Sequence, residues 1–148
     1  GLESCLYMGN IDALRDWGHA KDYVEMQWMM LQRKTPDDYV IATGVQSTIR
    51  KFVEITCKKL GIEIEWVGKG LKEKAIVKSI TKKYGYSFKL NSTIIKINKI
   101  YYRPSEVNEL LGNPSKAQKI LGWKPKIKLD QLISLMLKAS LVEEKKIN

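Results

Sequence analysis

The sequence is poor in the residues that bind metals or form disulfide frameworks. Its 148 residues include one histidine, His19, and two cysteines, Cys5 and Cys57, which form no Cys-x-x-Cys pair. One histidine with two distant cysteines cannot assemble a tetrahedral zinc site, and two thiols make no disulfide framework. We therefore expect no metal site and two free, buried thiols, as is usual in a reducing cytoplasm.

Long apolar runs and targeting signals are also absent. No apolar stretch approaches the roughly 18 residues that a membrane-spanning helix needs. The first eight residues, Gly1–Met8, contain neither a basic segment nor an initiator methionine, so they are no signal peptide. We expect a cytoplasmic chain with no membrane partner, cut from a longer protein.

Glycine-rich nucleotide loops are missing as well. Gly68 and Gly70 have no third glycine to complete a dinucleotide-binding turn, and no Gly-x-x-x-x-Gly-Lys-Ser/Thr sequence occurs. The single histidine, His19, precedes a predicted helix, and an ordinary structural role at the helix start is the better explanation for it. These absences predict that the chain contains no glycine-rich loop for a dinucleotide or a nucleoside triphosphate.

Positive charge is abundant but unevenly distributed. The net charge is +10, of which +8 lies in the lysine-rich residues 69–99, whereas residues 1–68 carry −2 and residues 100–148 carry +4. A basic domain raises nucleic acid as a partner. A small nucleic-acid-binding module using these lysines is therefore the alternative hypothesis, although a lysine run is usually a solvated face. Our main prediction is no nucleic-acid partner.

Periodicity and turn residues predict mixed α/β structure. The expected elements in chain order are helix 19–33, strand 39–42, helix 47–60, strand 62–66, strand 94–100, helix 114–121 and helix 129–144. Helix 19–33 is apolar on most sides, so we expect it to be buried, with its methionines and tryptophan filling a core. Ser47 is the expected N-cap of helix 47–60 and Gly61 its C′ residue. The last helix is expected to pack through Leu132, Met136, Ala139 and Val142.

Two arginines lie beside aromatic residues in distant parts of the chain. Arg15 precedes Trp17, and Arg103 follows Tyr102. The planar fork of arginine donates two hydrogen bonds to a phosphate, so two such arginines can clamp a diphosphate. On the charge pattern alone, two ordinary surface salt bridges are the better explanation.

Four stretches change that assessment. The longest, residues 9–25, reads Gly-Asn-Ile-Asp-Ala-Leu-Arg-Asp-Trp-Gly-His-Ala-Lys-Asp-Tyr-Val-Glu; the others are residues 38–44, residues 102–107, and residues 112–117 with 121–125. In order and rough spacing they resemble the GDP-mannose 4,6-dehydratases, which are extended short-chain dehydrogenases/reductases. The resemblance covers residues 8–67 and 100–142 and fades through 69–99, where the family varies in length.

This resemblance implies a fold and a domain organisation. Residues 1–148 are expected to form the C-terminal nucleotide-sugar-binding portion of an α/β enzyme, with helices packed on a few short strands. The NAD(P)-binding Rossmann module of the family, with its catalytic Tyr-x-x-x-Lys pair, is absent, since the nearest imitation, Tyr86–Lys89, is one residue short. Residues 69–99 are expected to be a lysine-rich variable segment. The chain alone is predicted to be inactive and to bind no cofactor.

The resemblance also implies a reaction and three site residues. The whole enzyme is expected to be a cytoplasmic, homo-oligomeric hydro-lyase that converts GDP-mannose to GDP-4-keto-6-deoxymannose, passing a hydride internally through NADP, in the biosynthesis of GDP-fucose and related deoxyhexoses. Arg15 and Arg103 are expected to hold the diphosphate. Glu106 is expected to accept hydrogen bonds from guanine, because an ionised carboxylate is acceptor-only and guanine presents adjacent N–H donors.

Other polar residues near these motifs have simpler explanations. Asp16 and Asp22 are expected to orient the loop and to cap the helix start. Arg50 can reach a phosphate, but an i,i+4 pair with Glu54 explains it without a ligand. Trp17 fits packing as well as stacking. A third possibility is a non-catalytic scaffold piece.

Overall fold

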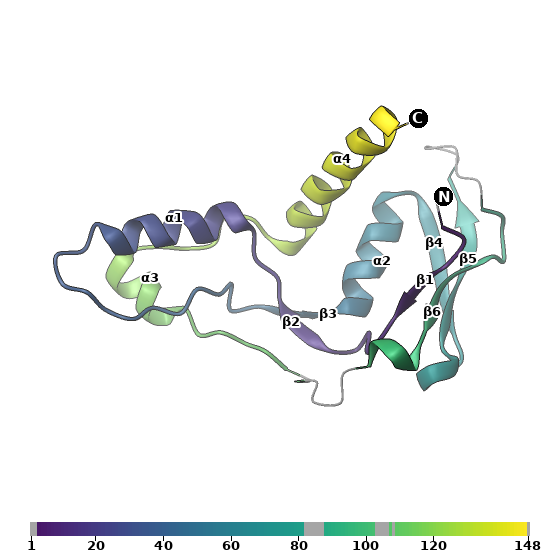
Figure 1. Ribbon diagram of the computed structural model, residues 1–148, viewed down its shortest axis with the longest axis horizontal. Helices are drawn as coiled ribbons and strands as arrows, with labels where there is room; N and C mark the ends of the chain where they lie inside the picture. The colour runs from purple at the N-terminus through teal and green to yellow at the C-terminus, as the bar shows by residue number, and fades with distance from the viewer. Residues whose placement is uncertain (1–2, 82–87, 103–106, 108, 148) are drawn as a thin grey trace. The chain divides into compact units, whose positions relative to one another are not determined.

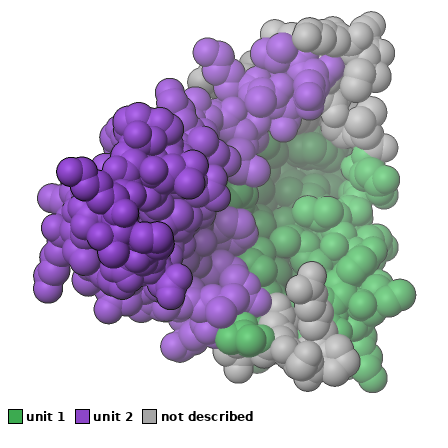
Figure 2. Space-filling model, turned by 60° about the vertical axis from the view of Figure 1, so that its left-hand side comes forward, with its two compact units in different colours: residues 1–13, 48–108 green, residues 14–47, 109–148 purple. Residues whose placement is uncertain are grey.

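A computed structural model describes residues 3–81, 88–102, 107 and 109–147 of the chain. The chain divides into two compact units, each made from two segments: residues 1–13 and 48–108 form unit 1, and residues 14–47 and 109–148 form unit 2. Figure 2 shows them in different colours. The units are described separately below.

Unit 1 is built on a mixed four-stranded sheet in the order β1-β6-β5-β4 (Figure 1). The strands are β1 (Leu6–Met8), β4 (Ile62–Val67), β5 (Lys74–Ile80) and β6 (Thr93–Ile97). β1 runs parallel to β6, and the other two pairings are antiparallel. The predicted strand 62–66 is confirmed, and its alternation is visible in the burial of Ile62 beside exposed Glu63.

Helix α2 (Ile49–Lys59) provides the second layer of unit 1. Its buried residues Val53 and Cys57 share a core with Ala75, Val77 and Ile95 of the sheet. Thr48, one residue after the predicted Ser47, is the N-cap and accepts a hydrogen bond from the Lys51 N–H at 3.0 Å. Gly61 follows the helix with φ +73°, as its predicted C′ role requires.

Unit 2 is mainly helical. It contains α1 (Ala20–Leu31), α3 (Ser115–Leu121) and α4 (Leu129–Ile147), with β2 (Leu14–Asp16) paired to β3 (Gln46–Thr48) at the chain's passage into α2. Met26, Ala117 and Trp123 form a buried cluster in this unit. The predicted helix 114–121 is confirmed from Ser115 on: Pro114 is the N-cap of α3, and Gly122, with φ +69°, is its C-cap. Asn113 accepts a hydrogen bond from the Ser115 N–H at 3.0 Å.

Three predictions about packing are wrong. Residues 39–42 form no strand, because among the described residues no strand pairs with them, although Ala42 is only 5% exposed. Helix α1 is not buried all round: Met26 is fully buried, but Trp28 is 62% exposed. In α4 the buried residue is Ile133, whereas Met136 is 50% exposed, so the expected stripe through Met136 is not the packed face.

The lysine-rich residues 69–99 contain more regular structure than the sequence indicated. The sequence did not indicate β5, because Lys74 and Lys78 confine its apolar run to three residues, of which Ala75 and Val77 are buried. The predicted strand 94–100 ends at Ile97. There a turn of 3₁₀ helix, η2 (Lys99–Tyr101), begins, and Asn98 caps it by accepting from the Ile100 N–H at 3.1 Å.

Candidate functional site

Arg15 lies in the middle of β2. Its Nη1 donates to the carbonyl oxygen of Leu14 at 2.8 Å. Leu14 also forms a parallel β-bridge with Glu109. The backbone next to Arg15 is therefore paired with the segment that directly follows residues 102–107, the stretch that contains the predicted ligands Arg103 and Glu106.

Arg103 and Glu106 lie outside the described residues, but the chain before them is described. The Asn98 N–H donates to the Met8 carbonyl at 2.8 Å. A Cβ added at Gly9 would lie 2.3 Å from the carbonyl oxygen of Tyr101, so only glycine allows this close approach. Within unit 1, the segment that leads towards Arg15 therefore runs against the segment that leads towards Arg103.

Asp16 confirms its predicted role in orienting the loop. One carboxylate oxygen accepts from the Thr43 N–H at 2.9 Å and from the Thr43 hydroxyl at 2.5 Å, and the other accepts from the Gly44 N–H at 2.8 Å. Next to it, the Trp17 indole N–H donates to the Ser47 carbonyl at 3.1 Å. These bonds attach the end of β2 to residues 43–47.

The start of α1 is capped by a different residue than expected. His19 is the N-cap, with Nδ1 accepting from the Lys21 N–H at 3.0 Å, so its predicted structural role at the helix start is confirmed. Asp22 does not cap the helix. It is 2% exposed and accepts from the N–H groups of Lys126 and Ile127, both at 2.9 Å, so it braces the segment before α4.

Aromatic residues complete this brace. The Trp123 indole N–H donates to the Asp22 carbonyl at 2.9 Å, and the Trp123 and Tyr23 ring centroids lie 6.4 Å apart. Burial, and then the nearby charges of Asp16 and Asp22, raise the pKa of Tyr23, which keeps its phenol neutral. Its hydroxyl lies over Gly18, where a Cβ would clash with it.

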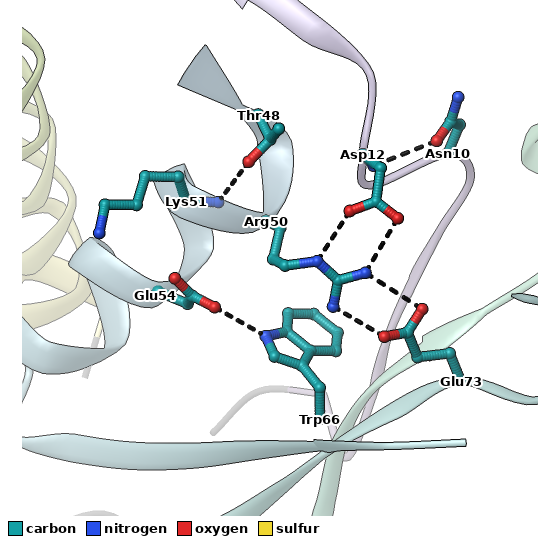
Figure 3. A network of polar contacts seen from close by, with 8 residues as sticks. All are labelled: Asn10, Asp12, Thr48, Arg50, Lys51, Glu54, Trp66 and Glu73. Carbon is teal, nitrogen blue, oxygen red and sulfur yellow. Dashed lines mark hydrogen bonds and ion pairs between the residues drawn. The ribbon is translucent and has the colours of Figure 1, made fainter. Parts of the chain in front are cut away.

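Arg50 belongs to a closed charge network in unit 1 (Figure 3). Its Nε and Nη2 donate to Asp12 at 2.8 and 3.0 Å, and its Nη1 and Nη2 donate to Glu73 at 2.7 and 3.2 Å. The guanidinium carbon lies 4.7 Å from the centre of the Trp66 ring. Hydrogen bonds to Asp12, and then to Glu73, hold the pKa of Arg50 above its usual range, and Arg50 lowers the pKa of Asp12.

This network corrects the predicted Arg50–Glu54 pair. Glu54 instead accepts from the Trp66 indole N–H at 3.2 Å. The i,i+4 spacing allows a pair, but the two carboxylates from other segments give Arg50 four charge-assisted bonds, which are stronger than one exposed helix pair. Because most of its donors are occupied, Arg50 acts as a structural cross-link between α2, the segment before β2 and the start of β5.

Three other features of the described residues were considered as functional sites: the Cys57 thiol, possible metal ligands and a cavity. Burial raises the pKa of the Cys57 thiol to about 11, which removes it as a nucleophile near neutral pH. In the part of the chain that the structure describes, no cluster of His, Cys, Asp and Glu could hold a metal ion, and no helix has the length and apolar character of a membrane span. A cavity of about 460 Å³ in unit 1, lined by Glu54, Lys58 and Glu63 among others, contains none of the predicted site residues.

Nicotinamide dinucleotides are held by a particular kind of turn. Such cofactors bind where a strand passes into a helix through a glycine-rich turn. In this chain β3 passes directly into α2 at Thr48, without a glycine. Gly68 and Gly70, both with positive φ, lie after β4, where a 3₁₀ turn (Gly70–Lys72) begins, while Gly61 and Gly122 follow α2 and α3.

Comparison with solved structures defines the fold. A UDP-glucose 4-epimerase from Stenotrophomonas maltophila, with bound NAD and formylated UDP-arabinopyranose, matches 98% of this chain with a TM-score of 0.67 and 12% identity, over 37% of its own chain. The UDP-glucose 4-epimerase from Thermotoga maritima with UDP-glucose matches 97% of this chain with a TM-score of 0.62 and 17% identity, over 36% of its own. The fold is that of the extended short-chain dehydrogenase/reductase epimerases and dehydratases, which confirms the predicted fold class.

Sequence comparison gives the family. A model of the family described as GDP-mannose 4,6 dehydratase matches residues 1–136. GDP-mannose 4,6-dehydratases from Vibrio cholerae and Yersinia enterocolitica are 55% and 52% identical over 95% and 98% of this chain. This chain belongs to the GDP-mannose 4,6-dehydratase family, as its motifs predicted. It spans 38% and 39% of the length of these two relatives, and the matches give no support to the nucleic-acid-binding alternative.

Proposed function

We propose that this chain is the GDP-sugar-binding portion of an enzyme that converts GDP-mannose to GDP-4-keto-6-deoxymannose. The observation that carries the proposal is the 55% identity to the Vibrio cholerae GDP-mannose 4,6-dehydratase over 141 residues. Its chemical context is a hydro-lyase reaction that uses NADP, in a cytoplasmic route to GDP-fucose and related deoxyhexoses. The cofactor and the catalytic residues would belong to the remainder of the enzyme.

In this proposal Arg15 and Arg103 hold the diphosphate and Glu106 accepts hydrogen bonds from guanine. Two arginines suit a diphosphate because each donates a planar pair of N–H groups and stays charged at any working pH. The close approach of Gly9 to Tyr101 and the bridge between Leu14 and Glu109 support the pairing of the two stretches. The first contact lies within unit 1 and the second within unit 2, and each joins a residue near Arg15 in the chain to a residue near the stretch 103–106.

Two exposed features of unit 2, an apolar stripe on α1 and residues 39–42, support the proposal that this unit contacts the Rossmann module of the whole enzyme. Val24, Trp28 and Leu31 lie at i, i+4 and i+7 of α1 and are 60, 62 and 82% exposed. A stripe of this kind on a helix marks a contact with another domain or protein. Residues 39–42 are strand-like in composition but pair with no strand in the described part of the chain, which suits a segment that adds to the sheet of that module. The whole enzyme is proposed to be a homo-oligomer.

The test is a chimera in which this chain replaces its matching segment in the Vibrio cholerae enzyme. We expect the chimera to consume GDP-mannose and release GDP-4-keto-6-deoxymannose, because 55% identity supports a common fold and, under this proposal, the two segments bind the same GDP-sugar. Product is measured by chromatography with GDP-mannose and, as the control, UDP-glucose. A folded chimera that leaves GDP-mannose unchanged would contradict the proposal.

A further inference from the structure

Asp16 and Asp22 belong to one motif, but they hold different parts of unit 2. Asp22 is nearly fully buried and binds the backbone of Lys126 and Ile127, far along the chain from any predicted ligand. Asp16 directly follows Arg15 and binds Thr43 and Gly44. Comparing variants of Asp16 and Asp22 can therefore distinguish a residue that positions Arg15 from a residue that only stabilises the fold.

The bonds of Asp16 use both of its oxygens. Oδ1 accepts from the Thr43 N–H and hydroxyl, and Oδ2 accepts from the Gly44 N–H. Hydrogen bonds to an ionised group are roughly twice as strong as neutral ones. Gly44 has φ +75°, a conformation that glycine adopts without strain, so the turn is shaped to present its N–H groups to the carboxylate.

These bonds fix the backbone on both sides of Arg15. On the N-terminal side, Leu14 bridges to Glu109. On the C-terminal side, Asp16 is bonded to residues 43 and 44, and Trp17 donates to Ser47. A long side chain loses less conformational freedom on binding a ligand when its backbone is already held in place.

We propose that Asp16 is a positioning residue for ligand binding by Arg15, whereas Asp22 serves stability alone. The proposal rests on the proposed function above, in which Arg15 binds the diphosphate of GDP-mannose. Asparagine cannot replace Asp16, because one oxygen becomes an NH₂ group that faces an N–H donor instead of accepting from it. The turn then separates from β2 and Arg15 is no longer held in register.

The test compares Asp16→Asn with Asp22→Asn in the chimera described above. For Asp16→Asn we expect KM for GDP-mannose to rise about tenfold with kcat within about twofold, since a lost charged hydrogen bond is typically worth a factor of this size. For Asp22→Asn we expect a lower melting temperature and an unchanged KM. Thr43→Val, which removes only the hydroxyl donor, is expected to raise KM about threefold.

Hydrogen exchange supplies a structural readout that does not depend on turnover. Peptides that contain Thr43 and Gly44 are expected to exchange faster in Asp16→Asn and at the wild-type rate in Asp22→Asn. An unchanged KM in both Asp16→Asn and Thr43→Val, or an equal rise in Asp22→Asn, would overturn the inference. An unsubstituted chimera that is folded but inactive would instead overturn the proposed function.

Discussion

The main helices of the two units present different outer surfaces. In α2 of unit 1, the exposed residues are Lys51 and Lys58, which is how a helix looks when its solvent side faces only water. In α1 of unit 2, Val24, Trp28 and Leu31 are exposed. The outer face of α2 therefore carries charged side chains suited to water, whereas the outer face of α1 carries apolar side chains suited to contact with a further partner.

Polar contacts differ in the same way. The Arg50 network of unit 1 closes on itself through Asp12, Glu73 and Trp66 (Figure 3). In unit 2, Glu25 and Asp37 pair with lysines, but Asp16 and Asp22 bind backbone N–H groups, and Asp16 does so beside Arg15. A self-satisfied network cross-links the fold, while a carboxylate that fixes a turn can set the position of its neighbour.

The largest expected effect is the difference in the free energy of unfolding between substitutions on the buried and on the exposed face of α1. Met26 is fully buried and Trp28 is 62% exposed on the same helix. We expect Met26→Ala to lower the free energy of unfolding of the 148-residue chain by about 3 kcal/mol, as truncation of a buried methionine usually does. Trp28→Ala is expected to change it by less than about 0.5 kcal/mol.

Urea denaturation followed by circular dichroism measures both values. In the chimera, where the proposed partner is present, Trp28→Ala is expected to lower the melting temperature clearly. A large loss for Trp28→Ala in the isolated chain would show that this face is already packed, and the contrast between α1 and α2 would fail.

The next largest effect tests the closed network of unit 1. Arg50→Met leaves Asp12 and Glu73 facing each other without their shared cation. We expect a loss of about 2 kcal/mol in the free energy of unfolding, below the cost of breaking a fully buried pair because Asp12 is largely exposed.

The matched control is Lys78→Met, which removes an exposed ion pair with Glu65. Exposed pairs contribute little, so we expect a change below about 0.5 kcal/mol in the same denaturation experiment. Equal losses for the two variants would contradict the assignment of Arg50 as a cross-link.

Thiol reactivity tests how well the core of unit 1 is closed. Cys57 is 7% exposed with a pKa of about 11, whereas Cys5 is half-buried. At pH 7 a thiol-reactive dye is expected to label Cys5 readily in the native chain and Cys57 only after denaturation, as mass spectrometry of peptides can show. Rapid native labelling of Cys57 would indicate that α2 opens from the sheet.

The smallest expected effect is a pH dependence. Arg50 lowers the pKa of Asp12 below its usual 3.8, so the ion pair stabilises the folded state above about that pH, and this contribution is lost as the pH falls through the lowered value. The difference in melting temperature between wild type and Asp12→Asn is therefore expected to shrink from pH 5 to pH 2.5. A constant difference over that range would show that the charge of Asp12 contributes nothing.

Local signals in the sequence predicted elements better than they predicted packing. Helix 47–60 and strand 62–66 were predicted because their side chains follow one period and Gly61 separates them. Residues 39–42 have strand composition, but a strand also needs a neighbour, which composition does not supply. In α4 the packed position is Ile133, since the face that is buried depends on what the helix packs against.

In the candidate site, too, local features could be predicted from the sequence and long-range contacts could not. A motif identified Arg15 and the loop-orienting Asp16, but nothing local indicated that Asp16 would bind Thr43, 27 positions away. The partners of Arg50 were missed because Asp12 and Glu73 are distant in sequence, whereas the i,i+4 rule considers only one helix. Long-range pairs of this kind are set by the folded topology.

The most direct test of the account is the KM for GDP-mannose of the chimera carrying Arg15→Met. The control is Arg33→Met, which removes an exposed arginine just beyond α1 with no proposed role in binding. Loss of a bidentate contact to a diphosphate is expected to raise KM by about tenfold or more in Arg15→Met, with no change in Arg33→Met. An unchanged KM in Arg15→Met would contradict the claim that this chain binds the diphosphate of the GDP-sugar through Arg15.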